Sequence, residues 1–274
     1  MTNDMKNISL VIFCSNAFRS NAFLPSALVS ALLLISASGC SKSEPAAPQP
    51  ASVPAKAATI SINPATAGSV SGVVSFKGAV PKLATLDMSA DPGCPPKPQP
   101  SEAALVKNGR LANVFVYVKA GLPAGSFAIP AEPVVLTQHG CRYQPRVLGA
   151  MVGQQFKVTN TDTADHNIHN MPHGNPEWNE SQMPTDPPIV KTFAKPEMQM
   201  ILQCNQHPWM RAYLNIMTHP NYAVSGEDGT FQIANLPPGD YTIAAVHEKF
   251  GEQTIQVKVG AKESAKAAFT FAPQ

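Results

Sequence analysis

Proline is the feature that most restricts the folds open to this chain. The sequence contains 27 prolines, about twice the share of roughly 5% that is usual. A proline ring fixes φ and removes a backbone donor, so frequent prolines interrupt helices and favour turns between short strands. No segment is convincing as a helix of normal length. The sequence therefore predicts an all-β fold, and its 274 residues suffice for one large or two small domains.

The charge and composition of the chain argue against several classes of function. The formal net charge is +2 and charged residues make up 14%, well below the roughly 25% of typical soluble domains. Nucleic-acid binding needs clustered Lys and Arg to neutralise phosphates, so we expect no nucleic-acid partner. The chain shows no G-x-S-x-G context, no phosphate-binding loop and no informative pair of carboxylates, so we expect no enzymatic activity.

The first 39 residues are typical of an export signal. A basic flank is followed by an uncharged apolar run over 22–35, and small residues at 36–39 lead to Cys40. This order defines a secretory signal, and the apolar run is shorter than the about 20 residues of a membrane span. We therefore predict that residues 1–39 are a signal peptide and that the protein is exported to the periplasm.

The small residues that end on Cys40 resemble a bacterial lipobox, although Ala37 stands where that box usually has Leu. The resemblance implies a lipoprotein, cleaved before Cys40 and anchored to the membrane by lipid on the cysteine sulfur. Ser41, rather than Asp, then implies sorting to the outer membrane. An ordinary signal peptide with an unmodified Cys40 is the alternative. Residues 40–66 are rich in Pro, Ala and Ser with little apolar surface to bury, so we predict a disordered tether.

The cysteines separate into different roles. There are five of them: Cys14, Cys40, Cys94, Cys141 and Cys204. Cys14 leaves with the signal peptide and Cys40 takes the lipid. Paired cysteines form disulfides in an oxidising compartment, and an odd count leaves one thiol for another role. Cys94 and Cys141 both lie in loops that contain Pro or Gly, so we predict that they form the disulfide and that Cys204 is free.

Cys204 opens a pattern of metal-ligand residues. His207 and Met210 follow it at steps of three, and His166 lies upstream. A thiolate, two imidazoles and a distant thioether are the ligands of a trigonal blue-copper site. The thiolate bonds covalently to Cu(II), the imidazoles suit both oxidation states, and the weak axial sulfur tunes the reduction potential. We expect Cys204 to end a strand, and a tight loop stiffened by Pro208 to return His207 and Met210 to the same metal.

The stretch from 134 to 217 resembles a cupredoxin, and its short ligand loop is most similar to the amicyanin type. Residues 144–160 resemble the family's run of strand, Gly turn, strand and Asn, and residues 166–169 resemble its first-ligand loop. The resemblance implies one type 1 copper ion with four ligands: His166, Cys204, His207 and Met210. It also implies that Asn167, which follows the first ligand, ties the two ligand loops together.

Several alternatives to this ligand set stay open. His169 could replace His166 as the ligand. Residues three apart on an extended strand point to opposite faces, so only one of the two histidines can face the metal and the other is expected just outside the ligands. His173 could join His169 in an auxiliary copper site or be a solvated loop histidine. Cys204 could also be a buried free thiol without a metal.

A second β module surrounds this region. Residues 226–247 show two alternating runs, with the turn dipeptides Asp228-Gly229 and Pro238-Gly239. They resemble a carboxypeptidase regulatory-like (prealbumin-like) β-sandwich, whose usual opening strand and turn occur far upstream at 70–81. We interpret this as one sandwich split by an inserted cupredoxin, and two consecutive sandwiches are the simpler alternative. The predicted domains are 67–131 and 219–274 for the halves of the split sandwich and 132–218 for the cupredoxin.

Two functions are compatible with the sequence. The first is a periplasmic lipoprotein that carries single electrons on one copper and exchanges them with a redox partner such as a cytochrome or a copper enzyme. The second is copper storage or delivery, because thioethers favour Cu(I). The methionines that keep the second function open are Met171, Met183, Met198, Met200 and Met217.

Overall fold

The computed structural model describes residues 58–273, which form twenty strands and no helix. This confirms the predicted all-β fold class. The predicted signal peptide, Cys40 and the tether up to residue 57 lie outside the described residues. Within 58–273, the chain has no helix that is long and apolar enough to cross a membrane.

Two sheets contain strands from both ends of the described chain, and we name them together the split sandwich. The first sheet has the order β17-β1-β5-β4, with β20 also paired to β1. Its strands are β1 (Gly68–Phe76), β4 (Val106–Lys107), β5 (Arg110–Leu111), β17 (Thr230–Leu236) and β20 (Ser264–Phe271). The second sheet has the order β16-β6-β18-β19. Its strands are β6 (Phe115–Ala120), β16 (Tyr222–Val224), β18 (Gly239–His247) and β19 (Gly251–Val259).

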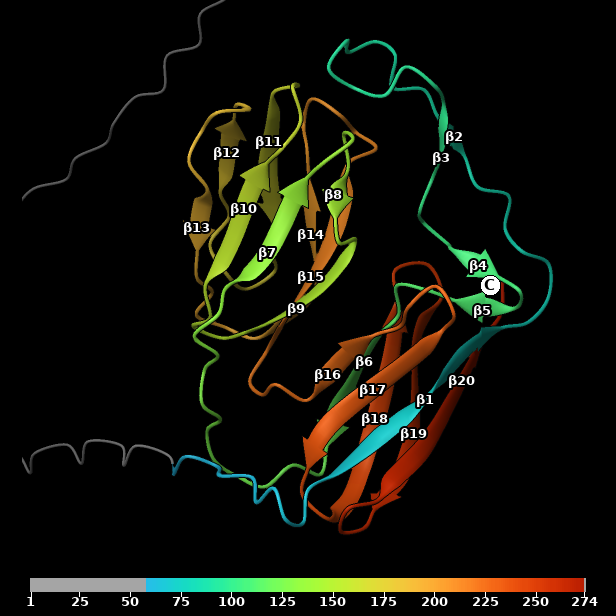
Figure 1. Ribbon diagram of the computed structural model, residues 1–274, viewed down its shortest axis with the longest axis vertical. Coiled ribbons are helices and arrows are strands. Elements are labelled where there is room, and N and C mark those ends of the chain that lie inside the picture. The colour runs from blue at the N-terminus through green and yellow to red at the C-terminus, as the bar shows by residue number, and fades with distance from the viewer. Residues whose placement is uncertain (1–57, 274) are drawn as a thin grey trace, which may run out of the picture. The chain divides into compact units, whose positions relative to one another are not determined.

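The first and last of these strands lie side by side, as Figure 1 shows for β1 in cyan and β20 in dark red. They pair in parallel, from Ser69 opposite Ser264 to Phe76 opposite Phe271. Side chains alternate between the two faces of a strand, so Val70 and Val74 of β1 point inward and are fully buried. There they share a core with Ile243 of β18 in the other sheet.

The residues between β6 and β16 form two further sheets, which we name the inserted sandwich. One sheet has the order β13-β10-β7-β8 and the other β12-β11-β14-β15-β9. The strands of the first are β7 (Val134–Gln138), β8 (Tyr143–Gln144), β10 (Phe156–Asn160) and β13 (Ile189–Lys191). Those of the second are β9 (Val147–Met151), β11 (His166–Met171), β12 (Asn179–Gln182), β14 (Glu197–Gln203) and β15 (Arg211–Met217). Since β6 pairs with both β16 and β18, the chain completes the split sandwich only after it has passed through the inserted one.

The core and the strand register of the inserted sandwich set up its functional end. Leu136 and Phe156 from one sheet pack with Leu202 and Leu214 from the other, and all four are fully buried. Strands β11 and β14 are antiparallel, with His169 opposite Gln203. This register brings the start of β11 close to the residues that follow β14.

A short excursion between β1 and β4 reaches the inserted sandwich. Strands β2 (Thr85–Leu86) and β3 (Gln99–Pro100) pair in antiparallel, and we name residues 87–98 between them the cap segment. Met88 and Cys94 of the cap segment are buried in the core of the inserted sandwich. From the sequence we expected all of 67–131 to belong to the split sandwich. The structure differs here because the apolar Met88 finds its buried contacts in the other core.

The start of the described chain also differs from the prediction of a tether up to residue 66. The backbone N–H of Ile60 donates to the carbonyl of Ser126 over 2.7 Å, and Lys262 N–H donates to the carbonyl of Thr66 over 3.2 Å. These backbone hydrogen bonds are satisfied within the folded protein. Residues 59–66 therefore belong to the folded part and not to the tether.

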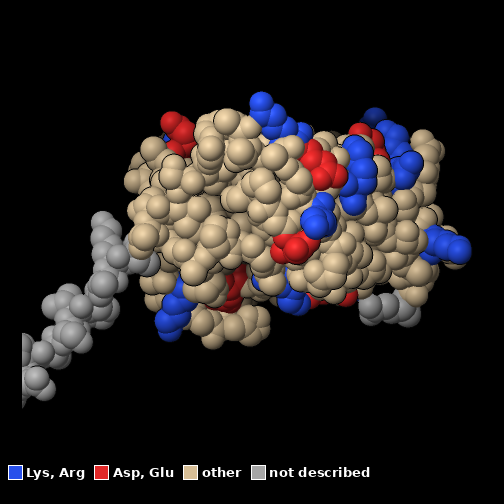
Figure 2. Space-filling model, turned by 90° about the horizontal axis from the view of Figure 1, so that it is seen from below, with Lys and Arg blue, Asp and Glu red and all other residues tan. Residues whose placement is uncertain are grey.

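Acidic and basic side chains are mixed on the face of the molecule shown in Figure 2, and most of that face carries neither. This distribution matches the low content of charged residues, 14%. The face presents no extended field of one sign, which is what electrostatic steering of a highly charged partner requires.

Candidate metal centre

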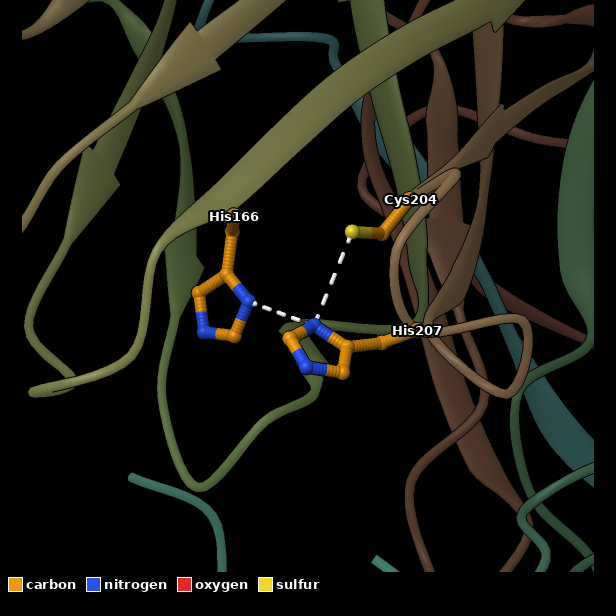
Figure 3. A group of neighbouring side chains, drawn as sticks. All are labelled: His166, Cys204 and His207. Carbon is orange, nitrogen blue, oxygen red and sulfur yellow. Dashed lines mark hydrogen bonds between the residues drawn. The ribbon is translucent and has the colours of Figure 1, made fainter. Parts of the chain in front are cut away.

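Three potential ligand atoms converge at the end of the inserted sandwich (Figure 3). The Nδ1 atoms of His166 and His207 are 3.0 Å apart, and Cys204 Sγ lies 3.7 Å from His207 Nδ1. Each residue of the trio offers a donor atom within 4.8 Å of the other two. All three side chains are buried, with 0% exposure for His166, 2% for Cys204 and 4% for His207. The arrangement is a compact pocket of one sulfur and two nitrogen donors.

A tight loop brings His207 back to Cys204. Cys204 directly follows β14, and β15 begins at Arg211. The N–H of Met210 donates to the carbonyl of His207 over 2.8 Å, and the N–H of Cys204 donates to the carbonyl of Met210 over 3.2 Å. These bonds close the loop at both ends, as the three-residue steps predicted. Met210 is buried in the same core as Cys204, and its role as a fourth ligand stays a prediction.

Asn167 connects the strand of His166 to this loop. Its Oδ1 accepts the N–H of Asn205 over 2.8 Å and lies 3.2 Å from Cys204 Sγ. Its Nδ2 donates to Asn179 Oδ1 over 2.7 Å, which fixes the orientation of the amide. The side chain therefore holds the two ligand-bearing segments at a constant separation.

His169 and His173 take other partners. His169 Nε2 lies 2.7 Å from Glu177 Oε1, and its Nδ1 lies 3.3 Å from Asn205 Oδ1. The side chain of His173 is 87% exposed. Within the described residues, neither histidine belongs to a group of three His, Cys, Asp or Glu donors. Of the two candidates on β11, the structure thus brings His166, and not His169, to Cys204.

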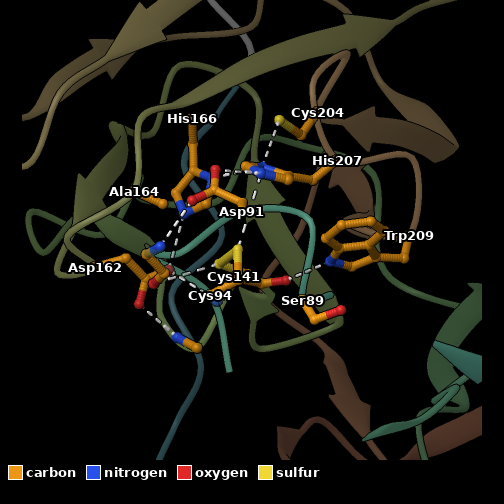
Figure 4. Close-up of a disulfide and its surroundings, with 12 residues drawn as sticks. Ser89, Asp91, Cys94, Cys141, Asp162, Ala164, His166, Cys204, His207 and Trp209 are labelled. Carbon is orange, nitrogen blue, oxygen red and sulfur yellow. Dashed lines mark hydrogen bonds and ion pairs between the residues drawn. A yellow bond between two sulfur atoms is a disulfide. The ribbon is translucent and has the colours of Figure 1, made fainter. Parts of the chain in front are cut away.

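The predicted disulfide between Cys94 and Cys141 is present, and Cys204 is the free cysteine of the described chain. The position of the disulfide beside the three donors was not predicted from the sequence. Cys94 Sγ lies 3.8 Å from His207 Nε2, so the disulfide borders the three donors (Figure 4). Trp209 Nε1 donates to the carbonyl of Cys141 over 3.0 Å, which ties the ligand loop to the same disulfide.

Two aspartates that the sequence pattern did not indicate contact the outer nitrogens of the histidines. Asp162 Oδ2 lies 2.8 Å from His166 Nε2, and Asp91 Oδ2 lies 3.0 Å from His207 Nε2 (Figure 4). The position of Asp162, four residues before His166, was a local signal that could have found it. Asp91 is 116 residues from His207 and comes from the cap segment, so nothing local in the sequence marked it.

The donors are electrostatically coupled. Burial lowers the pKa of His166, but hydrogen bonds to Asp162 and Cys204 outweigh burial and raise this pKa to about 9. Burial raises the pKa of Cys204, but the hydrogen bond to His166 and backbone hydrogen bonds outweigh burial and lower this pKa to about 7. Because the thiolate and not the thiol binds metals, the lowered pKa makes the binding form of the sulfur easier to reach near neutral pH.

The chemistry of this donor set fits copper. Structural zinc sites use four strong nitrogen or sulfur ligands in a tetrahedron. The described residues bring together only three at this place, His166, Cys204 and His207. Two imidazoles and one thiolate, with a thioether residue such as Met210 close by in sequence, are the donors of blue-copper centres.

No protein-family model and no curated protein matches the chain. Among solved structures, amicyanin from Paracoccus versutus is similar over 37% of this chain and 97% of its own, with 18% identity and a TM-score of 0.29. A purple cupredoxin from Nitrosopumilus maritimus is similar over 31% and 99%, with 19% identity and a TM-score of 0.27. A Cu-containing nitrite reductase from Thermus scotoductus SA-01 is similar over 36% of this chain but only 25% of its own, with 20% identity and a TM-score of 0.30. TM-scores this low carry no argument about the site, so the assignment of a metal rests on the donor atoms alone.

Proposed function

We propose that this protein is a type 1 blue-copper protein that carries single electrons on the exported side of the cell envelope. The observation that carries the proposal is the convergence of the free, buried thiol of Cys204 with the Nδ1 atoms of His166 and His207. We assign these three as the strong ligands and Met210 as the weak fourth. Copper bound there supplies a one-electron couple.

The chain contributes rigidity and the exclusion of water. The ligand loop is closed by backbone hydrogen bonds, and Asn167 connects it to β11. Donors fixed in this way change little between oxidation states, which keeps the reorganisation energy of electron transfer low. The near-complete burial of the three donors shields them from bulk water, which supports electron carriage.

The disulfide supports an exported location, because such bonds persist in oxidising compartments. We propose that residues 1–39 direct export, that lipid on Cys40 anchors the protein to the outer membrane, and that the chain up to residue 57 is the tether. The redox partner is proposed to be a cytochrome or a copper enzyme of the same compartment. We also propose that the split sandwich orients the copper domain of 132–218 toward that partner.

Copper storage or delivery is the second candidate, and the exposure of two methionines is what favours it. Met171 is 39% exposed and Met183 is 56% exposed, so both thioethers are accessible to Cu(I). Met200 and Met217 are buried in cores and are not available. The electron-transfer function is favoured because the sulfur of Cys204 is buried together with the two histidine donors.

An absorption spectrum of the oxidised, copper-loaded protein tests the proposal. We expect an intense visible band from thiolate-to-Cu(II) charge transfer in the wild type. Cys204→Ser removes the thiolate and must abolish the band. His169→Ala is the matched control, since it removes a histidine of the same strand that bonds to Glu177 instead. A protein that binds copper only as colourless Cu(I) would contradict electron carriage and support storage or delivery.

A further inference from the structure

A carboxylate stands at the outer nitrogen of each histidine in the donor set. We propose that Asp91 and Asp162 are positioning residues that hold the Nε2–H groups of His207 and His166 and lower the reduction potential of the bound copper. This inference rests on the proposed function, since it assigns the control of the same site. Figure 4 shows both carboxylates beside the histidines, together with the disulfide.

Asp162 is oriented before it meets the histidine. Its Oδ1 accepts the N–H of Gly140 over 2.6 Å, and its Oδ2 accepts the N–H of Cys141 over 2.8 Å. Its own N–H donates to Asn160 Oδ1 over 3.0 Å. The side chain is 7% exposed. Because backbone donors already fix both oxygens, Oδ2 presents an acceptor to His166 Nε2 in a constant direction.

Asp91 reaches His207 because the cap segment packs closely against the loop of Asp162. Asp91 Oδ1 accepts the N–H of Gly93 over 2.8 Å, which leaves Oδ2 for His207 Nε2. A Cβ atom at Gly93 would lie 2.8 Å from the Cβ and the backbone N of Ala164, so this close approach requires glycine. Ala164 follows Asp162 by two residues, so this contact joins the segments that carry the two carboxylates.

The disulfide links the cap segment, which carries Asp91, to the turn that orients Asp162. Cys94 lies three residues after Asp91, and Cys141 supplies an N–H to Asp162. The bond thus joins the segment that carries one aspartate to the turn that orients the other. Cys94 Sγ also lies 3.8 Å from His207 Nε2, so the disulfide borders the contact between Asp91 and His207.

These contacts have two consequences for the site. A neutral imidazole that donates its Nε2–H to a carboxylate has its lone pair on Nδ1, so in the copper-loaded protein both histidines would offer Nδ1 to the metal. A carboxylate partner also raises the basicity of the ligand. Two negative charges beside the ligands stabilise Cu(II) more than Cu(I), which lowers the reduction potential.

Two kinds of substitution separate position from charge. Asp91→Asn and Asp162→Asn remove the negative charge and keep one oxygen that can accept the Nε2–H, while the amide nitrogen replaces the oxygen that accepts the N–H of Gly93 or Gly140. Asp91→Ala and Asp162→Ala remove the acceptor as well. Asp87→Asn and Asp165→Asn are the matched controls. Asp87 is in the same cap segment but bonds to Ser89, and Asp165 is exposed on the loop of Asp162.

The first measurement is a redox titration of the copper-loaded protein. We expect each Asn variant to raise the Cu(I)/Cu(II) ratio at a fixed potential about tenfold, which is about 59 mV for a one-electron couple. The two controls should shift the ratio less than about twofold, or about 18 mV on the same scale. Asn variants that titrate together with their controls would overturn the role of the charges.

The second measurement follows the Nε2–H resonances of His166 and His207 by NMR in the metal-free protein. We expect both protons to be protected from solvent exchange in the wild type and in the Asn variants, and each to be lost in the corresponding Ala variant. Unprotected protons in the wild type would overturn the positioning role. This measurement needs no copper, so it still decides the inference if the visible band is absent and the proposed function fails.

Discussion

Arg146 and Glu248 form a two-point ion pair between the inserted and the split sandwich. Nε of the arginine lies 2.6 Å from Oε1 of the glutamate, and Nη2 lies 2.9 Å from Oε2. Arg146 lies between β8 and β9, and Glu248 lies between β18 and β19. The side chains are only 10% and 6% exposed, so the pair is shielded from solvent at the place where Phe115, Val147 and Tyr213 share a cluster.

Removing one partner of this pair should destabilise the protein strongly. We expect Glu248→Gln to lower the free energy of unfolding by about 3–5 kcal/mol, because it leaves the buried charge of Arg146 without its carboxylate partner. Urea unfolding measures the change. Glu227→Gln is the control, since Glu227 pairs with Lys107 while both are more than two-thirds exposed, at 78% and 72%, and exposed pairs contribute little. Equal effects of the two substitutions would contradict the buried role of the pair.

The stability of the protein should fall between neutral and weakly acidic pH because of His247. Burial lowers the pKa of this side chain to about 4, while the unfolded chain has a pKa of about 6.5. Below pH 6.5 the unfolded state therefore binds a proton that the folded state does not bind. The free energy of unfolding should drop by at most about 3 kcal/mol as the pH falls through this window.

Urea unfolding at several pH values tests this dependence. His247→Leu should reduce the slope of the profile between pH 6.5 and pH 4, since the leucine does not titrate. His139→Gln changes an exposed histidine and should leave the slope unaltered. A wild-type profile as flat as that of His247→Leu would show that His247 is not the titrating group.

The ligand assignment predicts a distinct spectrum for each substitution. Met210→Leu should keep the copper and the visible band but raise the reduction potential, because loss of a weak donor destabilises Cu(II) more than Cu(I). His166→Ala should lose or convert the band, since a strong ligand is gone. Visible spectra and redox titrations of the two variants provide the check. A bleached His169→Ala protein next to a blue His166→Ala protein would mean that the wrong histidine was chosen.

The disulfide should contribute both stability and retention of the metal. It links positions 47 residues apart, for which chain entropy alone predicts about 4 kcal/mol. We expect the double substitution of Cys94 and Cys141 by serine to lower the free energy of unfolding by about 2–5 kcal/mol. It should also speed the removal of copper by a chelator, because the cap segment that contacts His207 is no longer held. Unchanged chelation kinetics would limit the disulfide to a structural role.

Membrane attachment is proposed to depend on one cysteine outside the described residues. Cys40→Ser removes the site of lipidation, so the variant should move from the membrane fraction to the soluble fraction and lose the mass of the lipid. A single acyl chain gives only marginal binding, so stable attachment implies a multiply acylated cysteine. Unchanged fractionation and mobility of the variant would contradict a lipid anchor.

The parts of the site that sequence could predict are those set by local spacing. The steps from Cys204 to His207 and Met210 imply a tight turn, and the two loop closures of the structure follow from it. The opposite orientation of His166 and His169 on one strand follows from the two-residue period of β structure. The all-β class follows from the prolines and from alternating runs such as 230–236.

The position of the cap segment could not be predicted, because no local sequence pattern indicates it. Residues 87–98 have no alternation, and their position depends on Met88 and Cys94 entering a core made mostly by residues 134–217. The cysteine count predicted one free thiol, and the loop positions of Cys94 and Cys141 predicted their pairing, but neither gives information on what lies beside the disulfide. The contact of Asp91 with His207 depends on packing over 116 residues of sequence separation.

The nested order of the chain has a consequence for biogenesis. If the polypeptide emerges from its N-terminus, the cap segment and all of 134–217 are available before any of β16 to β20 has appeared. Domains generally fold as units in order of appearance, so the copper ligands can assemble while β1 and β6 still lack their C-terminal partners. Copper loading can then precede completion of the surrounding sandwich, which requires β20 to pair with β1.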